Sequence, residues 1–447
     1  MGDSPNKDQI SDFELANNCV LEPSMRSRHM REEVYCQLIK QLTHNPDKTS
    51  EDRGWQLLVH MSSTVIPGSD LVEECELFMK GSLHRMAAPC LDRFQTTKRN
   101  GYRQYPPHQK EYELLRSNER TIKFDVVLPF NERQSVEVET TSRVFDIKQQ
   151  LLTKFDLVDA AMEYGLFFAL RDRVLGAYDG DYFMDALCHV ERFWTKLAHS
   201  GRVSQASPEP PPEPHVFFMK KIWVNAEPGQ HRMADSMFHF PQELPNYLRG
   251  FHKFSNVDLA RMAAYIYRGQ FGEDLAGMIN FHENINALIP RSHAKTKSVD
   301  EWRKAVETNL KLTKDLSPDK AKVEFLKTIW AWPTYGSVFF EVKQRMMKTM
   351  PKHLLLAVNP NGVLLLDPES KDILANYEYG KIPNWAFDEF SFTLVVGESS
   401  NATKIFFETS VGHNIDDVVM SYVAWTMNTH IKKRPKYAGV TVGESSC

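Results

Sequence analysis

The sequence has few cysteines, no long apolar run and no signal-peptide core. Its 447 residues include six cysteines that form no CxxC pair, which disfavours a structural zinc site or a disulfide scaffold and fits a reducing compartment. No uninterrupted apolar run approaches the roughly 18 residues that a membrane helix needs. The first ten residues are polar, unlike a secretory signal. We therefore expect a cytoplasmic protein.

Motifs that mark enzymes are also missing. The P-loop, GxGxxG, GxSxG and HExxH patterns do not occur, and His282-Glu283-Asn284 has no second histidine at the spacing of a zinc protease helix. Asp179-Gly180-Asp181 resembles the start of a calcium loop, but the closing glutamate of an EF-hand is absent. We expect a protein that is not an enzyme, with no catalytic residue, no metal site and no cofactor.

Length and composition predict several globular domains. A chain of 447 residues corresponds to two to four domains of roughly 100–200 residues, and 42% hydrophobic with 25% charged residues is an ordinary globular composition. The net charge of −4 gives no support for nucleic acid as a partner. Between Lys80 and Arg120, however, nine basic residues stand against four acidic ones. This local excess suits an acidic partner, with solvated helix ends as the alternative.

Helical periodicity dominates the first quarter of the chain. Met30, Val34, Leu38 and Leu42 recur every four residues and define one stripe of a helix, which Asn45-Pro46 ends. Trp55, Leu58, Val59 and Ser62 have the same helical spacing. These patterns predict a helical bundle over residues 10–118.

The period changes at residue 121. Alternating apolar residues over 122–128 and 136–138 predict a hairpin, Ser142 can cap a helix, and the apolar run Gly165–Leu170 predicts another strand. This order suits a small α+β lobe over residues 119–203. The proline-rich segment 204–214 then predicts an extended linker, with a recognition segment for a proline-binding partner as the alternative.

Two further lobes follow the linker. Helical patterns over residues 215–316 predict an α-helical lobe. Over residues 317–434, six short apolar runs separated by turn sequences predict antiparallel strands, and Asn414 can cap a terminal helix. A sheet closed by one helix is the architecture of the pleckstrin-homology and phosphotyrosine-binding domains. Residues 435–447 are expected to be a flexible tail. The six predicted strands are Ser337–Val342, His353–Val358, Gly362–Leu366, Ile373–Tyr377, Phe390–Val396 and Lys404–Glu408.

The last lobe offers a candidate peptide-binding groove. If Phe390–Val396 is an edge strand beside the terminal helix, its unpaired backbone groups can receive an extended peptide. The alternative is that the same side chains only fill the core of the lobe. The candidate groove residues are Phe390, Phe392, Leu394 and Val396 from the strand and Ile415, Val418, Val419 and Tyr422 from the helix.

Three motifs resemble a known tandem. Residues 31–46 (REEVYCQLIKQLTHNP), 53–58 (RGWQLL) and 100–107 (NGYRQYPP) are similar, in sequence and order, to the fourth-type myosin tail homology domain that precedes a FERM domain. The resemblance implies a multidomain α+β fold, a helical bundle followed by a three-lobed FERM domain. Its lobes would be ubiquitin-like at 119–203, acyl-CoA-binding-protein-like and helical at 215–316, and pleckstrin-homology or phosphotyrosine-binding-like at 317–434.

The resemblance also implies a function. It is that of a non-catalytic, cargo-binding and cytoskeleton-linking tail module of an unconventional myosin of the class VII, X or XV kind, cytoplasmic and located at the cell cortex or in filopodia. The third lobe would bind peptides or cytoplasmic tails of cargo proteins. A basic patch would bind microtubules or other acidic protein surfaces, and a basic end would fold back on the motor domain to inhibit it. The residues implied are Lys98, Arg99, Arg103 and Lys110 for the patch and Lys432, Lys433 and Arg434 for the fold-back contact.

A second interpretation stays open, in which the tandem belongs to a motorless adaptor or to a kinesin. Such a protein would scaffold phosphoinositide membranes and receptor tails, because FERM lobes can present basic clefts to anionic phospholipid. Only residues 12–23 of the helical bundle precede the Tyr-Cys-Gln helix, so we expect a fragment of a longer polypeptide or a shortened variant. That the chain stops after the last FERM helix favours a C-terminal tail.

Overall fold

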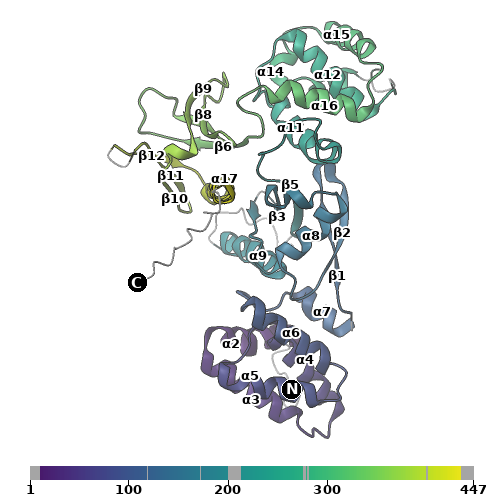
Figure 1. Cartoon of the computed structure of the whole chain (residues 1–447), viewed down its shortest axis with the longest axis vertical. Coiled ribbons are helices and arrows are strands. Elements are labelled where there is room, and N and C mark those ends of the chain that lie inside the picture. The colour runs from purple at the N-terminus through teal and green to yellow at the C-terminus, as the bar shows by residue number, and fades with distance from the viewer. Residues whose placement is uncertain are drawn as a thin grey trace, which may run out of the picture. The chain divides into compact units, whose positions relative to one another are not determined.

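The structure is a computed structural model that describes residues 11–117, 119–171, 173–199, 213–274, 278, 281–398 and 401–433. The chain divides into two units (Figure 1). The first contains residues 1–154 and 165–218, and the second contains residues 155–164 and 219–447. Each unit is built from two parts, described in turn below.

A bundle of helices opens the first unit. Its two longest helices begin at polar caps: the Ser27 side chain accepts from the Met30 N–H, and the Asp47 carboxylate accepts from the Thr49 and Ser50 N–H groups. Trp55 is buried at the centre. The elements are α1 (Asp12–Leu15), the π-helix η1 (Ala16–Leu21), α2 (Glu22–Arg26), α3 (Arg28–Leu42), α4 (Lys48–Thr64), α5 (Ser69–Gly81), α6 (Ala87–Asn100) and α7 (Gln109–Ser117).

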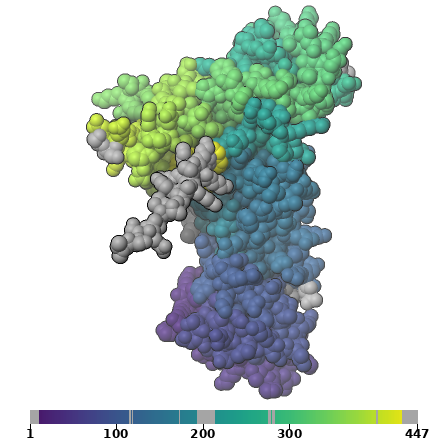
Figure 2. Space-filling model, viewed as in Figure 1, coloured from purple at the N-terminus to yellow at the C-terminus, as the bar shows by residue number. Residues whose placement is uncertain are grey.

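A five-stranded sheet with two helices completes the first unit. The strand order is β2-β1-β5-β3-β4, with β1 antiparallel to β2 and parallel to β5. In Figure 2 the purple bundle and the blue sheet region share one unbroken surface. The elements are β1 (Ile122–Val127), β2 (Arg133–Val138), α8 (Val144–Lys154), β3 (Tyr164–Leu170), β4 (Arg173–Gly176), α9 (Phe183–His199) and β5 (His215–Lys220).

Strand β5 corrects the predicted start of the helical lobe at residue 215. Its side chains alternate between exposed or half-buried and buried, and its residues Val216 and Phe217 pair with Val126 and Val127 of β1. The backbone of β5 is therefore part of the five-stranded sheet. The proposed linker 204–214 lies outside the described residues except for Glu213 and Pro214.

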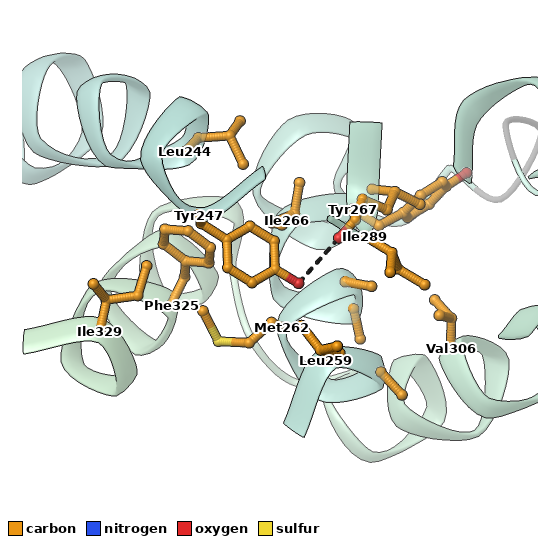
Figure 3. Close-up of a cluster of buried hydrophobic side chains, with 14 of the residues drawn as sticks. Leu244, Tyr247, Leu259, Met262, Ile266, Tyr267, Ile289, Val306, Phe325 and Ile329 are labelled. Carbon is orange, nitrogen blue, oxygen red and sulfur yellow. Dashed lines mark hydrogen bonds between the residues drawn. The ribbon is translucent and has the colours of Figure 1, made fainter. Parts of the chain in front are cut away.

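An α-helical lobe begins the second unit. Its core packs aromatic rings and branched side chains (Figure 3), and the Tyr247 hydroxyl donates to the Leu288 carbonyl oxygen at 3.2 Å. The helices are α10 (Arg232–Ala234), the π-helix η4 (Asp235–His239), α11 (Phe240–Leu248), α12 (Asn256–Phe271), α13 (Phe281–Leu288), α14 (Arg291–Ala294), α15 (Val299–Leu312) and α16 (Pro318–Trp330).

Helix α16 corrects the predicted end of this lobe at residue 316. Phe325, Leu326 and Ile329 of α16 are fully buried in the same cluster as Trp302 of α15. A helix that shares the core of a lobe belongs to that lobe, so the helical lobe continues to Trp330.

A seven-stranded antiparallel sheet and one long helix complete the second unit. The strand order is β10-β11-β12-β6-β7-β8-β9. The predicted strands are all present, and a further strand, β10, was not predicted. Helix α17 begins at Gly412, two residues before the expected cap. The elements are β6 (Val338–Lys343), β7 (His353–Asn359), β8 (Gly362–Leu366), β9 (Ile373–Tyr377), β10 (Asn384–Phe387), β11 (Ser391–Val396), β12 (Thr403–Glu408) and α17 (Gly412–Lys433).

Candidate functional site

The strand predicted to form the edge of the peptide groove is not an edge strand. Strand β11 pairs with β10 on one side and with β12 on the other. Its Phe392 and Leu394 side chains are fully buried, Val396 is half-buried, and Phe390 precedes the strand with an exposed side chain. The expectation for an edge at 390–396 was wrong because the four-residue strand β10 occupies that edge.

The predicted groove residues of the helix face the core instead. Ile415, Val418, Val419 and Tyr422 are all buried against the sheet. The Tyr422 hydroxyl accepts a hydrogen bond from the Trp223 N–H at 3.0 Å, and burial raises the pKa of this phenol well above its usual value. These side chains pack helix α17 against the sheet. They therefore fill the core of the lobe, which was the alternative to a peptide groove.

The edge strand β10 lies beside one flank of α17 (Figure 1). The Trp385 indole Nε1–H donates to the Asp416 carboxylate at 2.8 Å and so ties the strand to the helix. At the start of the helix, a Cβ on Gly412 would lie 2.6 Å from the Ser391 carbonyl oxygen, so the helix approaches the sheet closely there. Phe387 of β10 and Met420, one helical turn beyond Asp416, are 47% and 44% exposed. Together they give the flank an apolar surface.

The four residues of the predicted basic patch have separate surroundings. Arg103 is completely buried, and its guanidinium contacts the carboxylates of Glu111 at 2.5 Å and Asp185 at 2.8 Å. Burial alone would lower the pKa of Arg103, but the charges of Asp185 and Glu111 raise it. The assignment of Arg103 to a solvent-facing patch was therefore wrong, because this side chain joins the helical bundle to α9.

The remaining members of the patch have weaker contacts. Lys98 forms an ion pair with Glu76 at 3.0 Å, and Arg99 donates to the Thr96 hydroxyl. Lys110 lies over the Phe124 ring, 4.9 Å from its centre, and 3.5 Å from Glu213. Of the four predicted patch residues, two are classed as exposed, Lys98 and Arg99. They are neighbours in the last turn of α6.

A buried histidine lies near the same junction. The His60 ring stacks on Tyr112 with 5.0 Å between ring centres. Burial, aided by the charges of Arg93 and Arg103, lowers the pKa of His60 to about 3. The imidazole is therefore neutral in the folded chain at neutral pH.

Other candidate groups give no site. Arg434 and the side chains of Lys432 and Lys433 lie outside the described residues. Where side chains are described, no group of three or more His, Cys, Asp or Glu is placed to hold a metal ion. No helix in the described parts is long and apolar enough to cross a membrane.

Sequence reasoning did not find the strand that forms the sheet edge, nor the two carboxylates that surround Arg103. Asn384–Phe387 has only four residues, between Pro383 and Asp388, which is too short for a clear alternating pattern. Glu111 and Asp185 are separated by 74 positions, so no local spacing reveals that they share Arg103.

Comparison with known families supports the architecture seen here. Family models match a MyTH4 domain over residues 18–114, a FERM central domain over 230–340 and a PTB domain of the IRS-1 type over 340–427. A structure of the human myosin 7b C-terminal MyTH4-FERM domain, in complex with the harmonin-a PDZ3 domain, is 34% identical and has a TM-score of 0.84. That match covers 95% of this chain and 85% of the other chain.

Two full-length myosins are also similar in sequence to nearly the whole of this chain. Myosin-VIIa of Drosophila melanogaster and unconventional myosin-VIIb of Mus musculus are each 34% identical over 97% of this chain. The chain spans about one fifth of the length of these relatives, 20% of each. The predicted fold class, a helical domain followed by three FERM lobes, is confirmed. The chain belongs to the MyTH4-FERM family found in the tails of unconventional myosins.

Proposed function

We propose that this chain is a non-catalytic binding module of a myosin tail that captures an extended segment of a cargo protein. The observation that carries the proposal is the position of β10, which ends the sheet and pairs with β11 alone among the described strands. A strand at a sheet edge offers backbone donors and acceptors to an added strand. The human myosin 7b tail is in complex with a PDZ domain, so proteins that carry PDZ domains are the first partners to test.

The side chains beside β10 favour a peptide with apolar residues. Phe387 and Met420 present exposed apolar surface on either side of the Trp385–Asp416 hydrogen bond. Methionine adapts its shape to different ligands and is common at surfaces that bind several partners. We expect backbone pairing to supply affinity and these side chains to supply sequence preference.

Peptide selection provides a direct test. Twelve-residue peptides displayed on phage are selected on the full chain, and the dissociation constant of the best binder is measured by fluorescence anisotropy. Phe387→Ser and Met420→Glu should each weaken binding at least about tenfold, because each removes apolar contact area from the surface beside β10. The matched control is Met346→Glu, which changes an exposed methionine on neither β10 nor α17. Equal affinities of the unchanged chain and all three variants would refute binding at this surface.

We further propose that Lys98 and Arg99 carry any binding of acidic surfaces such as microtubules. They are the two members of the predicted patch that are exposed. Arg103 is buried and forms ion pairs with Glu111 and Asp185, so it is not available to a partner. A fold-back contact through residues 432–434 and binding of anionic phospholipid stay predictions from the resemblance.

A further inference from the structure

The five-stranded sheet of the first unit has an edge that a side chain closes. Among the described strands, β2 pairs with β1 alone and so ends the sheet, and helix α8 lies beside it (Figure 1). A strand at a sheet edge normally presents unpaired backbone N–H and C=O groups, which are a template for pairing with another chain. What these groups of β2 bind therefore decides whether this edge can receive a further strand.

The Gln150 side chain of α8 binds the backbone of β2 at Glu137. The Glu137 N–H donates to Gln150 Oε1 at 3.2 Å, and Gln150 Nε2 donates to the Glu137 carbonyl oxygen at 2.9 Å. In an antiparallel ladder, a hydrogen-bonded pair of residues exchanges the same two bonds. A glutamine amide has the N–H donor and the carbonyl acceptor that this exchange requires. Gln150 therefore takes the position that a residue of an added strand would take.

A second glutamine covers the neighbouring carbonyl on the same edge. Backbone groups alternate in direction along a strand, so Ser135 directs its groups to the same edge as Glu137. Gln134 Nε2 donates to the Ser135 carbonyl oxygen at 2.7 Å, and the Lys154 ammonium of α8 donates to Gln134 Oε1. Side chains that α8 supplies or holds therefore satisfy both carbonyl groups.

The exposed face of β2 is complementary in charge to a second copy of the same strand. Arg133, Ser135 and Glu137 are exposed, whereas Val136 and Val138 are buried. If two copies of β2 paired antiparallel about Ser135, Arg133 of each copy would lie opposite Glu137 of the other. Opposite charges directly across a ladder stabilise the pairing. The strand is therefore suited to pair with itself in this register.

The charges on β1 already follow the same alternation. Lys123 lies opposite Glu137 in the β1–β2 register, and Arg133 Nη1 lies 4.0 Å from Asp125 Oδ2. A second copy of β2 would extend this face on its other side. Neither charge of β2 would have to leave its neighbour on β1.

We propose that the β2 edge is a latent surface for pairing with a second copy of this chain, and that Gln150 keeps this edge closed. The second copy has to displace both hydrogen bonds of Gln150 before its own backbone bonds to Glu137. This edge belongs to the first unit, whereas β10 belongs to the second. The proposal therefore does not depend on peptide binding at β10.

The test measures self-association of the full chain with and without the closing side chain. Sedimentation velocity is recorded over a concentration series for the unchanged chain, for Gln150→Ala and for the matched control Gln149→Ala. The control changes the neighbouring glutamine of α8 and keeps the Gln150 amide on β2. Gln150→Ala should dimerise at least about tenfold more tightly than the unchanged chain, because no hydrogen bond has to be displaced. Equal self-association of these two chains, or an equal gain in Gln149→Ala, would overturn the proposal.

Charge variants in the Gln150→Ala background identify the surface of the dimer. Arg133→Glu places a glutamate opposite Glu137 of the other copy, and it should weaken the dimer about fivefold or more. Adding Glu137→Arg restores opposite charges at both positions and should recover most of the affinity. A dimer that is insensitive to both changes would form through another surface, which would overturn the proposal.

Hydrogen exchange of residues 133–138 gives a readout that does not depend on charge. The Glu137 N–H loses its acceptor in Gln150→Ala and gains a new one in the dimer. Exchange in this variant should therefore be faster than in the unchanged chain at low concentration and should slow as the concentration rises. Exchange at β2 that stays fast in the dimer would show that the strand remains unpaired, and the proposal would be wrong.

Discussion

The buried arginine at the junction of the helical bundle and the ubiquitin-like lobe makes a sharp prediction about stability. Arg103 pairs with Glu111 and Asp185, and the side chains of all three are almost or completely buried. Both carboxylates also accept backbone N–H groups, those of His108 and Gln104. Replacing only the arginine by methionine keeps most of the volume but leaves two carboxylates buried without their cation.

The expected cost follows from that geometry. Removing one partner from a buried ion pair typically destabilises a protein by about 3–5 kcal/mol, because the remaining charge is neither hydrated nor paired. In a domain of 150–250 residues, each kcal/mol lowers the melting temperature by about 2–4 °C. We therefore expect Arg103→Met to lower the melting temperature of the first unit by about 6–20 °C. Hydrogen exchange should rise first in α6, α7 and α9.

Neutralising the carboxylates should reverse much of the loss. In the triple variant Arg103→Met, Glu111→Gln, Asp185→Asn, the amide oxygens can still accept the backbone N–H groups while no unpaired charge stays buried. The assay is thermal unfolding combined with hydrogen exchange mass spectrometry. Arg99→Met serves as the exposed control. If Arg103→Met costs no more than Arg99→Met, or if the triple variant is less stable than the single one, the reasoning is refuted.

Three further predictions concern other parts of the chain. His60 is neutral in the fold with a pKa of about 3, against 6.5 ordinarily. Stability should therefore fall as the pH drops below 6.5, by about 2–3 kcal/mol at pH 4.5, and His60→Phe should show less loss of melting temperature between pH 7 and 4.5. Changing Lys98 and Arg99 to Gln, which can still donate to Glu76 and Thr96, should reduce microtubule co-sedimentation severalfold at low salt and change the melting temperature little; equal binding would exclude this surface. Gly362 has φ +133°, and a Cβ there would lie 2.1 Å from the Tyr377 carbonyl oxygen. Gly362→Ala should therefore cost more than about 1 kcal/mol in urea unfolding.

Periodic burial explains which parts of the fold the sequence could predict. Trp55, Leu58, Val59 and Ser62 were placed on one helical stripe and all are buried. The same rule was less accurate in the preceding helix, where Met30 is 44% exposed. Hydrophobic periodicity reports the average face of an element. It therefore finds helices and long strands more reliably than the environment of one side chain.

The candidate sites depend on contacts that no local pattern contains. Arg103 was interpreted as solvent-facing because its neighbours in the sequence are basic, yet it lies in the connection between α6 and α7, and its partners Glu111 and Asp185 come from α7 and α9. Local charge density describes the chain, whereas burial is decided by what the fold brings to each residue.

The shortness of β10 connects the error at the groove with the function proposed for it. A long, apolar edge strand is easily recognised in a sequence, but it also invites pairing with other copies of the chain, and natural sheets commonly keep their edges short for that reason. Strand β10 has four residues and is tied to α17 through Trp385 and Asp416. Because β10 exposes so little backbone, backbone pairing alone would give a peptide little affinity. In the proposed mode, the peptide therefore also contacts side chains beside β10. If so, replacing Asp416 by Ala should free Trp385, loosen β10 and weaken peptide binding without removing any apolar contact surface. Stronger binding in that variant would contradict this role of the tryptophan–aspartate hydrogen bond.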